Sequence, residues 1–135
     1  MLQEQINTLK RMREDEQGFT LAELLIVVAI IMVLVAIAIP VFNGALHNSQ
    51  AATDMANARS LYADVTADYL SNGNECTAFE SGTYEAGDEV ALSDGETFEV
   101  QCGTITLTID EGKTPQVEYA CDNGDHEDTW GGGEN

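Results

Sequence analysis

The stretch GFTLAELL, residues 18–25, begins an apolar run that decides how the chain is organised. From Phe19 to Phe42, only Thr20 and Glu23 interrupt this run. It is apolar on every face of a helix and rich in valine and isoleucine, which is typical of a membrane-spanning helix. At about 1.5 Å rise per residue, such a helix reaches across the roughly 30 Å of a bilayer's hydrocarbon core. A carboxylate in this segment is costly unless it is paired, so Glu23 requires a partner.

The basic residues are distributed unevenly about the apolar run. Lys10, Arg11 and Arg13 precede it, whereas only Arg59 and Lys113 follow it. Because positively charged flanks stay in the cytoplasm, we predict an N-terminus inside the cell and a C-terminal part outside. The three cysteines, all downstream of the run, would then lie in an oxidising compartment where a disulfide persists.

The apolar run has three interpretations. The first is a secretory signal peptide, with residues 36–38 (AIA) as its cleavage site. The second is a single membrane anchor, and the third is a helix that moves from the membrane into an assembly. Glu23 and the acidic residues just before the run argue against the signal peptide. The pattern alone favours the anchor.

The composition excludes several classes of function. The 135 residues carry 5 Lys+Arg against 24 Asp+Glu, a net charge of −19. A nucleic-acid surface is not expected, because binding to phosphates requires clustered cations. The chain has no Ser/His/Asp set, phosphate loop or convincing carboxylate pair, so we predict a protein that is not an enzyme and has no cofactor.

The region that follows the apolar run is predicted to continue the helix on an amphipathic pattern. Apolar residues recur at steps of three and four between Val41 and Leu70, and Asp54, Asp64 and Asp68 are assigned to the other faces. Residues 71–74 (SNGN) are typical of a turn, which predicts the end of this helix. The amphipathic half, residues 43–72, needs a partner for its apolar face. The apolar positions of the pattern from Val41 to Leu70 are Phe42, Ala45, Leu46, Ala52, Met55, Ala56, Ala58, Leu61, Tyr62, Val65 and Tyr69.

The C-terminal region, residues 73–135, is predicted to begin as an acidic loop and to continue as an antiparallel sheet. Alternation of period two predicts at least three strands, with a change of phase across Gly103 and a hairpin turn at residues 110–113. The segment from Asp122 onward is predicted to be an acidic, glycine-rich tail. The fold class is therefore α+β: a long N-terminal helix packed on a small C-terminal antiparallel sheet. The alternating residues are Phe98, Val100 and Cys102; Ile105, Leu107 and Ile109; and Val117, Tyr119 and Cys121.

The N-terminal motif resembles that of the type IV pilins and their relatives, the pseudopilins and competence pilins. The resemblance rests on residues 18–25 and the apolar block after them, and it extends to about Tyr62. It implies cleavage by a prepilin peptidase between Gly18 and Phe19 and N-methylation of Phe19. It also implies that Glu23 and Pro40 are the residues of the family's fifth and twenty-second mature positions. One departure is the acidic sequence at residues 15–17, where the family often has basic residues.

The resemblance implies a structural subunit of a type IV pilus or similar filament. Residues 1–18 would be the leader, and residues 19–42 the membrane-spanning half of the helix and later the filament core. The implied partners are further copies of the chain, the prepilin peptidase, the assembly platform and its ATPase. The protein would lie in the cytoplasmic membrane as a prepilin and at the cell surface as a filament. The alternative is a monomeric, singly anchored extracellular binding or sensor module.

The resemblance also gives Glu23 a partner. Cleavage creates a positive amine at Phe19, which would pair with Glu23 of a neighbouring subunit in a low-dielectric bundle. The alternative is an interfacial carboxylate that reaches water. Pro40 predicts a kink, or a locally melted helix inside the filament.

A disulfide between Cys102 and Cys121 is expected. If the turn pairs Leu107 with Val117, a bulge at Gly103 brings Cys102 beside Cys121. The family often has a disulfide near the C-terminus, which supports this pair. Three cysteines still allow three pairings, with Cys76 as the odd residue. The spacing of the cysteines and of the two histidines, His47 and His126, does not indicate a zinc site, so no metal is expected.

Four acidic residues lie around Gly124, where some pseudopilins bind calcium. They do not match the spacing of an EF-hand loop, and a solvated acidic tail is the preferred interpretation. These residues are Asp122, Asp125, Glu127 and Asp128.

Overall fold

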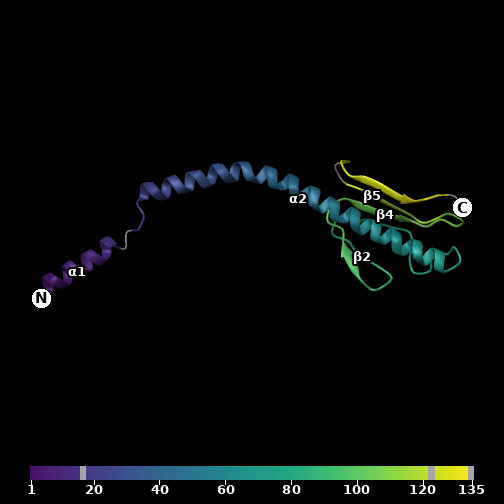
Figure 1. The fold of residues 1–135 in the computed structure, drawn as a ribbon, viewed down its shortest axis with the longest axis horizontal. Coiled ribbons are helices and arrows are strands. Elements are labelled where there is room, and N and C mark those ends of the chain that lie inside the picture. The colour runs from purple at the N-terminus through teal and green to yellow at the C-terminus, as the bar shows by residue number, and fades with distance from the viewer. Residues whose placement is uncertain (16–17, 122–123, 134–135) are drawn as a thin grey trace. The chain divides into compact units, whose positions relative to one another are not determined.

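A computed structural model describes residues 1–15, 18–121 and 124–133 (Figure 1), with the side chains of residues 12–15 left out. The chain divides into two units, residues 1–43 and residues 44–135, and each is described by itself. Their elements together give the α+β fold that the sequence predicts, a long helix followed by antiparallel sheet.

The first helix, α1, extends from Leu2 to Asp15 and was not predicted from the sequence. Its residues are good helix formers such as leucine, glutamine and lysine, so local propensity favours the helix. Leu2, Ile6 and Leu9 recur at steps of four and three, and all three are exposed. These apolar side chains therefore join no core among the described residues. Residues 16–17 of the predicted leader lie outside the described residues.

The second helix, α2, extends from Leu21 to Ser71, close to the predicted range. The helix is uninterrupted at Pro40. It ends in the predicted turn, where Gly73 and Asn74 have positive φ angles of 72° and 71°. The backbone N–H of Asn74 donates to the carbonyl of Tyr69 (2.9 Å), which satisfies one of the last helical carbonyls.

The C-terminal unit contains two antiparallel sheets. Strands β1 (Gly82–Glu85), β4 (Thr104–Thr108), β5 (Gln116–Ala120) and β6 (Glu127–Gly131) form a four-stranded sheet in the order β1-β4-β5-β6. Strands β2 (Glu89–Ala91) and β3 (Thr97–Glu99) form a two-stranded sheet. The prediction of at least three strands is thus confirmed.

Two predictions about irregular segments were wrong. The segment assigned to an acidic loop contains β1 and β2, and the segment assigned to a tail contains β6. These strands are short and rich in polar residues, so their alternation is weak. They exist because β4, β3 and β5 offer them backbone partners, which a local pattern does not reveal.

The predicted hairpin and its register are confirmed. Leu107 pairs with Val117 across β4 and β5, and the N–H of Lys113 donates to the carbonyl of Asp110 in the turn. The change of phase occurs at Gly103, whose φ angle is +86°. A Cβ at this position would overlap the carbonyl oxygen of Ala120, so glycine is required.

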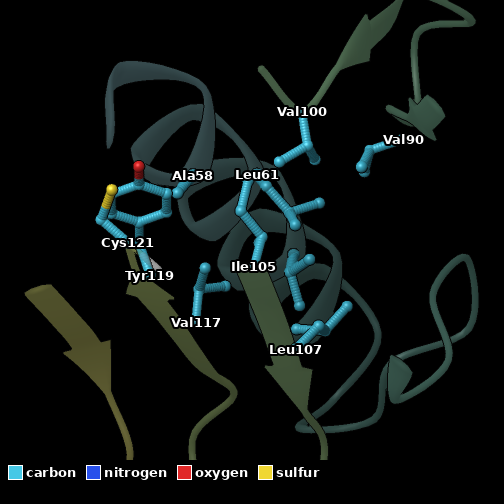
Figure 2. Packing of buried hydrophobic residues seen from close by; sticks show 10 residues of the cluster. Ala58, Leu61, Val90, Val100, Ile105, Leu107, Val117, Tyr119 and Cys121 are labelled. Atoms are coloured by element: carbon cyan, nitrogen blue, oxygen red, sulfur yellow. The ribbon is translucent and has the colours of Figure 1, made fainter. Parts of the chain in front are cut away.

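The core lies between the C-terminal part of α2 and the sheets (Figure 2). Ala58, Leu61 and Val65 of α2 pack against buried residues of the sheets. Burial of a large apolar side chain stabilises a fold by about 1.5–3 kcal/mol, so this cluster accounts for the pairing of helix and sheet. The sheet-side members are Val90, Val100, Ile105, Leu107, Val117, Tyr119 and Cys121. The predicted buried face is only partly correct, because Ala52 and Ala56 are exposed while Asp54 is fully buried.

Candidate functional site

The segment between α1 and α2 contains the predicted processing site. Gly18, Phe19 and Thr20 lie outside both helices, and all three are exposed. Phe19 is 82% exposed, and apart from Gly18 and its chain neighbours no heavy atom of the described residues lies within 4 Å of the position that a Cβ on Gly18 would take. A protease needs an accessible backbone that is free of helical hydrogen bonds, and the bond between Gly18 and Phe19 meets that requirement.

Glu23 takes part in a reciprocal cap at the start of α2. The Thr20 N–H donates to Glu23 Oε2 (2.8 Å), and the Glu23 N–H donates to Thr20 Oγ1 (3.2 Å). This is a capping box, which satisfies two N–H groups that the first helical turn leaves without partners. The sequence contains its signature, T-x-x-E at residues 20–23, but the motif was not recognised there.

The first half of α2 has an entirely exposed apolar surface. Every residue from 18 to 46 is exposed, including Phe19, Leu24 and Phe42. Among the described residues, α2 is the one helix that is long and apolar enough to cross a membrane by length and composition. An apolar surface of this extent in contact with water is unfavourable, so it needs lipid or protein around it.

The predicted cysteine pair is brought together by the fold. The Sγ atoms of Cys102 and Cys121 lie 3.9 Å apart, and both are free thiols in this structure. The proximity agrees with the register argument, but the disulfide itself is not confirmed. Cys76 lies elsewhere, with its Sγ 4.0 Å from the carbonyl oxygen of Val65, and burial raises its pKa.

A histidine completes the cluster around these two thiols. His47 Nε2 lies 3.3 Å from the Cys121 Sγ, and the donor atoms of His47, Cys102 and Cys121 all lie within 4.8 Å of one another. Cys121 is buried, while His47 and Cys102 are half-buried. Sequence spacing gave no indication of this cluster, because its members come from α2, the turn before β4 and the end of β5. Burial raises the pKa values of the Cys102 thiol and of the neighbouring Tyr119 hydroxyl.

Cys102 is held from two sides by buried polar groups. Its backbone N–H donates to Asp54 Oδ2 (2.6 Å), and its carbonyl oxygen accepts a hydrogen bond from the Tyr119 hydroxyl (2.9 Å). Asp54 also accepts a hydrogen bond from the Gln101 N–H (2.8 Å). The assignment of Asp54 to a polar face of the helix was therefore wrong. Its carboxylate is buried because it ties α2 to the turn that carries Cys102.

Two further aspartates of α2 fasten loops to the helix. Asp64 accepts hydrogen bonds from the N–H and the hydroxyl of Ser93. Asp68 accepts from the N–H groups of Ala78 (3.0 Å) and Thr77 (2.7 Å). These bonds, that of Ala78 foremost, lower the pKa of Asp68 below its ordinary value of 3.8 although desolvation acts in the opposite direction.

The acidic residues around Gly124 do not form the predicted tail. Glu127 and Asp128 belong to β6, and Asp128 Oδ1 accepts a hydrogen bond from the N–H of Thr129. Asp125 is exposed, and Asp122 lies outside the described residues.

Comparison with known proteins finds one family model and several curated relatives. The family model for the prokaryotic N-terminal methylation motif matches residues 14–39. A type IV major fimbrial protein FimA of Dichelobacter nodosus is 40% identical over 78 residues, which cover 58% of this chain and 48% of the relative. FimA of strain VCS1703A is 36% identical over 109 residues, which cover 81% of this chain and 59% of the relative. The chain spans about half the length of the curated relatives it matches. No solved structure matches the chain significantly.

Proposed function

We propose that this chain is a type IV pilin, as its methylation motif and its fimbrial relatives support. On this premise, it is the structural subunit of a pilus or pilus-like filament. The observation that carries the proposal is the exposed apolar half of α2, most of which lies within the residues that match the methylation motif. Such a helix is stable in a bilayer, and packing against copies of itself would cover the same surface in a filament. The relatives are fimbrial proteins, which argues against an enzyme.

The proposed maturation begins with removal of residues 1–18. A prepilin peptidase would cut between Gly18 and Phe19 and methylate the new amine of Phe19. The exposed, non-helical backbone at these residues supports the assignment. Before cleavage, residues 19–42 would anchor the protein in the cytoplasmic membrane with residues 1–18 in the cytoplasm. An assembly platform and its ATPase would then add the subunit to a filament at the cell surface.

Glu23 has a role at each stage in this proposal. In the uncleaved chain its carboxylate accepts a hydrogen bond from the N–H of Thr20. After cleavage, the amine of Phe19 on a neighbouring subunit provides a positive charge for the same carboxylate. In a bundle of low dielectric this attraction offsets the cost of burial and sets the register of the subunits. Pro40 would allow the helix to bend or locally melt as the filament packs.

We also infer that Cys102 and Cys121 form a disulfide once residues 43–135 are outside the cytoplasm. The oxidant is the disulfide of a dithiol oxidase, which accepts two electrons through exchange and is reduced to its dithiol, while the two cysteine thiols lose their protons. The short distance between the sulfur atoms supports this pairing over the two that involve Cys76.

A pair of variants separates the charge of Glu23 from its capping role. Glu23→Ala loses both, whereas Thr20→Ala loses the side-chain cap but keeps the carboxylate. We expect Glu23→Ala to yield a processed, membrane-bound protein that forms few filaments by electron microscopy, and Thr20→Ala to assemble. Equal loss of assembly in both variants would instead assign the defect to the start of the helix.

Mass spectrometry tests the wider proposal against a monomeric membrane-anchored module. Sheared extracellular fibres should contain a peptide that begins with N-methylated Phe19. An intact Met1 in the membrane fraction, with no fibres, would contradict the filament and support the anchored module.

A further inference from the structure

We propose that His47, Cys102 and Cys121 form a metal site for a thiolate-binding ion such as Zn²⁺ in the reduced chain. The proposal does not depend on filament formation, because it concerns the C-terminal unit of a single chain. Two sulfur atoms and one imidazole nitrogen are one of the donor sets that zinc takes in sites with three protein ligands and an open fourth position. Soft sulfur ligands select this ion over calcium and magnesium, despite the many carboxylates of the chain.

The distances within the cluster agree with a tetrahedral ion. With zinc–sulfur bonds of about 2.3 Å and a zinc–nitrogen bond of about 2.0 Å, tetrahedral angles place two sulfurs about 3.8 Å apart and a sulfur and a nitrogen about 3.5 Å apart. The corresponding separations are 3.9 Å between Cys102 and Cys121, and 3.3 Å between Cys121 and His47. The third separation, between His47 and Cys102, is within 4.8 Å, so two of the three separations are close to those of a bound ion and small side-chain movements would adjust the third.

The two cysteines are held by contacts that do not involve an ion. Asp54 and Tyr119 fix the backbone on either side of the Cys102 side chain, at its N–H and its carbonyl. Cys121 is fixed by the end of β5, where its N–H donates to the carbonyl of His126 (2.9 Å). A site whose ligands are positioned in advance loses less entropy when it binds an ion.

The other histidine and the other cysteine of the chain lie outside the cluster, and each provides a matched control. His126 contacts Asn48 through its Nε2 (3.3 Å), and its ring centroid lies 6.0 Å from that of His47. Cys76 lies beside Val65. Metal binding and the disulfide exclude each other, because the same two sulfur atoms serve as thiolates in the first and are bonded together in the second.

Cobalt is the probe, because it reports sulfur ligation by its spectrum. Reduced, metal-free full-length protein in detergent should develop a sulfur-to-cobalt charge-transfer band that saturates at one ion per chain and disappears when Zn²⁺ is added. Cys102→Ser, Cys121→Ser and His47→Ala should each weaken binding about tenfold or more. Cys76→Ser and His126→Ala should bind as the wild type does. Cobalt bound without the charge-transfer band would mean carboxylate binding only and would overturn the proposal.

A measurement on the wild-type chain avoids the risk that a variant does not fold. Of the three thiols, Zn²⁺ should protect two from a thiol reagent and leave Cys76 reactive. In Cys76→Ser, both remaining thiols should be protected, and a chelator should restore their reactivity. Equal reactivity with and without Zn²⁺, or protection that includes Cys76, would contradict the site.

Discussion

The buried carboxylate of Asp54 offers the sharpest test of how this fold is held together. Its side chain is 0% exposed, and its two oxygens accept hydrogen bonds from the N–H groups of Gln101 and Cys102. In Asp54→Ala both donors lose their charged partner. Each such bond contributes about 1.5–3 kcal/mol, so we expect a loss of about 3 kcal/mol or more. That is a large part of the roughly 5–15 kcal/mol that stabilises a typical domain.

Urea unfolding of the full-length chain in detergent measures this loss. Trp130, the single tryptophan, lies in β6 and packs against the core, so its fluorescence reports the C-terminal unit. With a urea dependence of about 1–2 kcal/mol per molar, the midpoint should fall by about 1.5–3 M at an unchanged slope. The urea midpoint of Asp54→Asn should lie between those of the wild type and of Asp54→Ala, because the amide oxygen of asparagine accepts one N–H but its amide nitrogen accepts none.

Asp64→Ala is the matched control. It is the same substitution on the same helix and also removes two hydrogen bonds, those from Ser93. These bonds are exposed, so water replaces them and we expect a loss of about 1 kcal/mol. An Asp54→Ala midpoint no lower than that of Asp64→Ala would refute the reasoning that burial determines what this carboxylate contributes.

Three further predictions follow from the geometry and the charge. Gly103→Ala should destabilise the C-terminal unit more than Gly112→Ala does, as measured by urea unfolding. Both glycines have positive φ, which costs a non-glycine residue about 1–3 kcal/mol of strain. Of the two positions, only 103 has atoms where the new Cβ would lie. A similar loss in both variants would contradict the clash. Because folding lowers the pKa of Asp68, its contribution to stability is present above its ordinary value of 3.8 and is lost as the pH falls through the folded value. The free energy of unfolding of Asp68→Asn should therefore converge on that of the wild type in acid, and a constant difference at all pH values would contradict this. In the proposed filament, removal of residues 1–18 would leave a charge of −18 per subunit, and subunits of like charge repel one another. Such filaments should dissociate when salt or divalent cations are withdrawn, as measured by sedimentation, and sedimentation that does not respond to either would show that this repulsion is unimportant.

The sequence pattern was sufficient to predict those features whose physical cause lies in neighbouring residues of the chain. The apolar run after residue 18 indicated the helix and its need for lipid or protein, because every face of it is apolar. The turn after Ser71 and the hairpin at residues 110–113 followed from glycine and asparagine at positions that need positive φ. The register of Leu107 with Val117 followed from that turn, since the turn fixes which residues face each other.

The sequence by itself therefore determined the N-terminal motif, the long helix and the central hairpin. Only the tertiary structure decided that Asp54 is buried, that β6 joins the sheet, and that His47 lies against the pair Cys102 and Cys121. The reason is physical: Asp54 and its donor Gln101 are 47 residues apart and His47 and Cys121 are 74 apart, while β6 depends on backbone groups that β5 offers rather than on its own weak alternation. A buried aspartate has the same local signature as an exposed one, and the backbone donors that make its burial favourable appear only when the sheet packs on the helix.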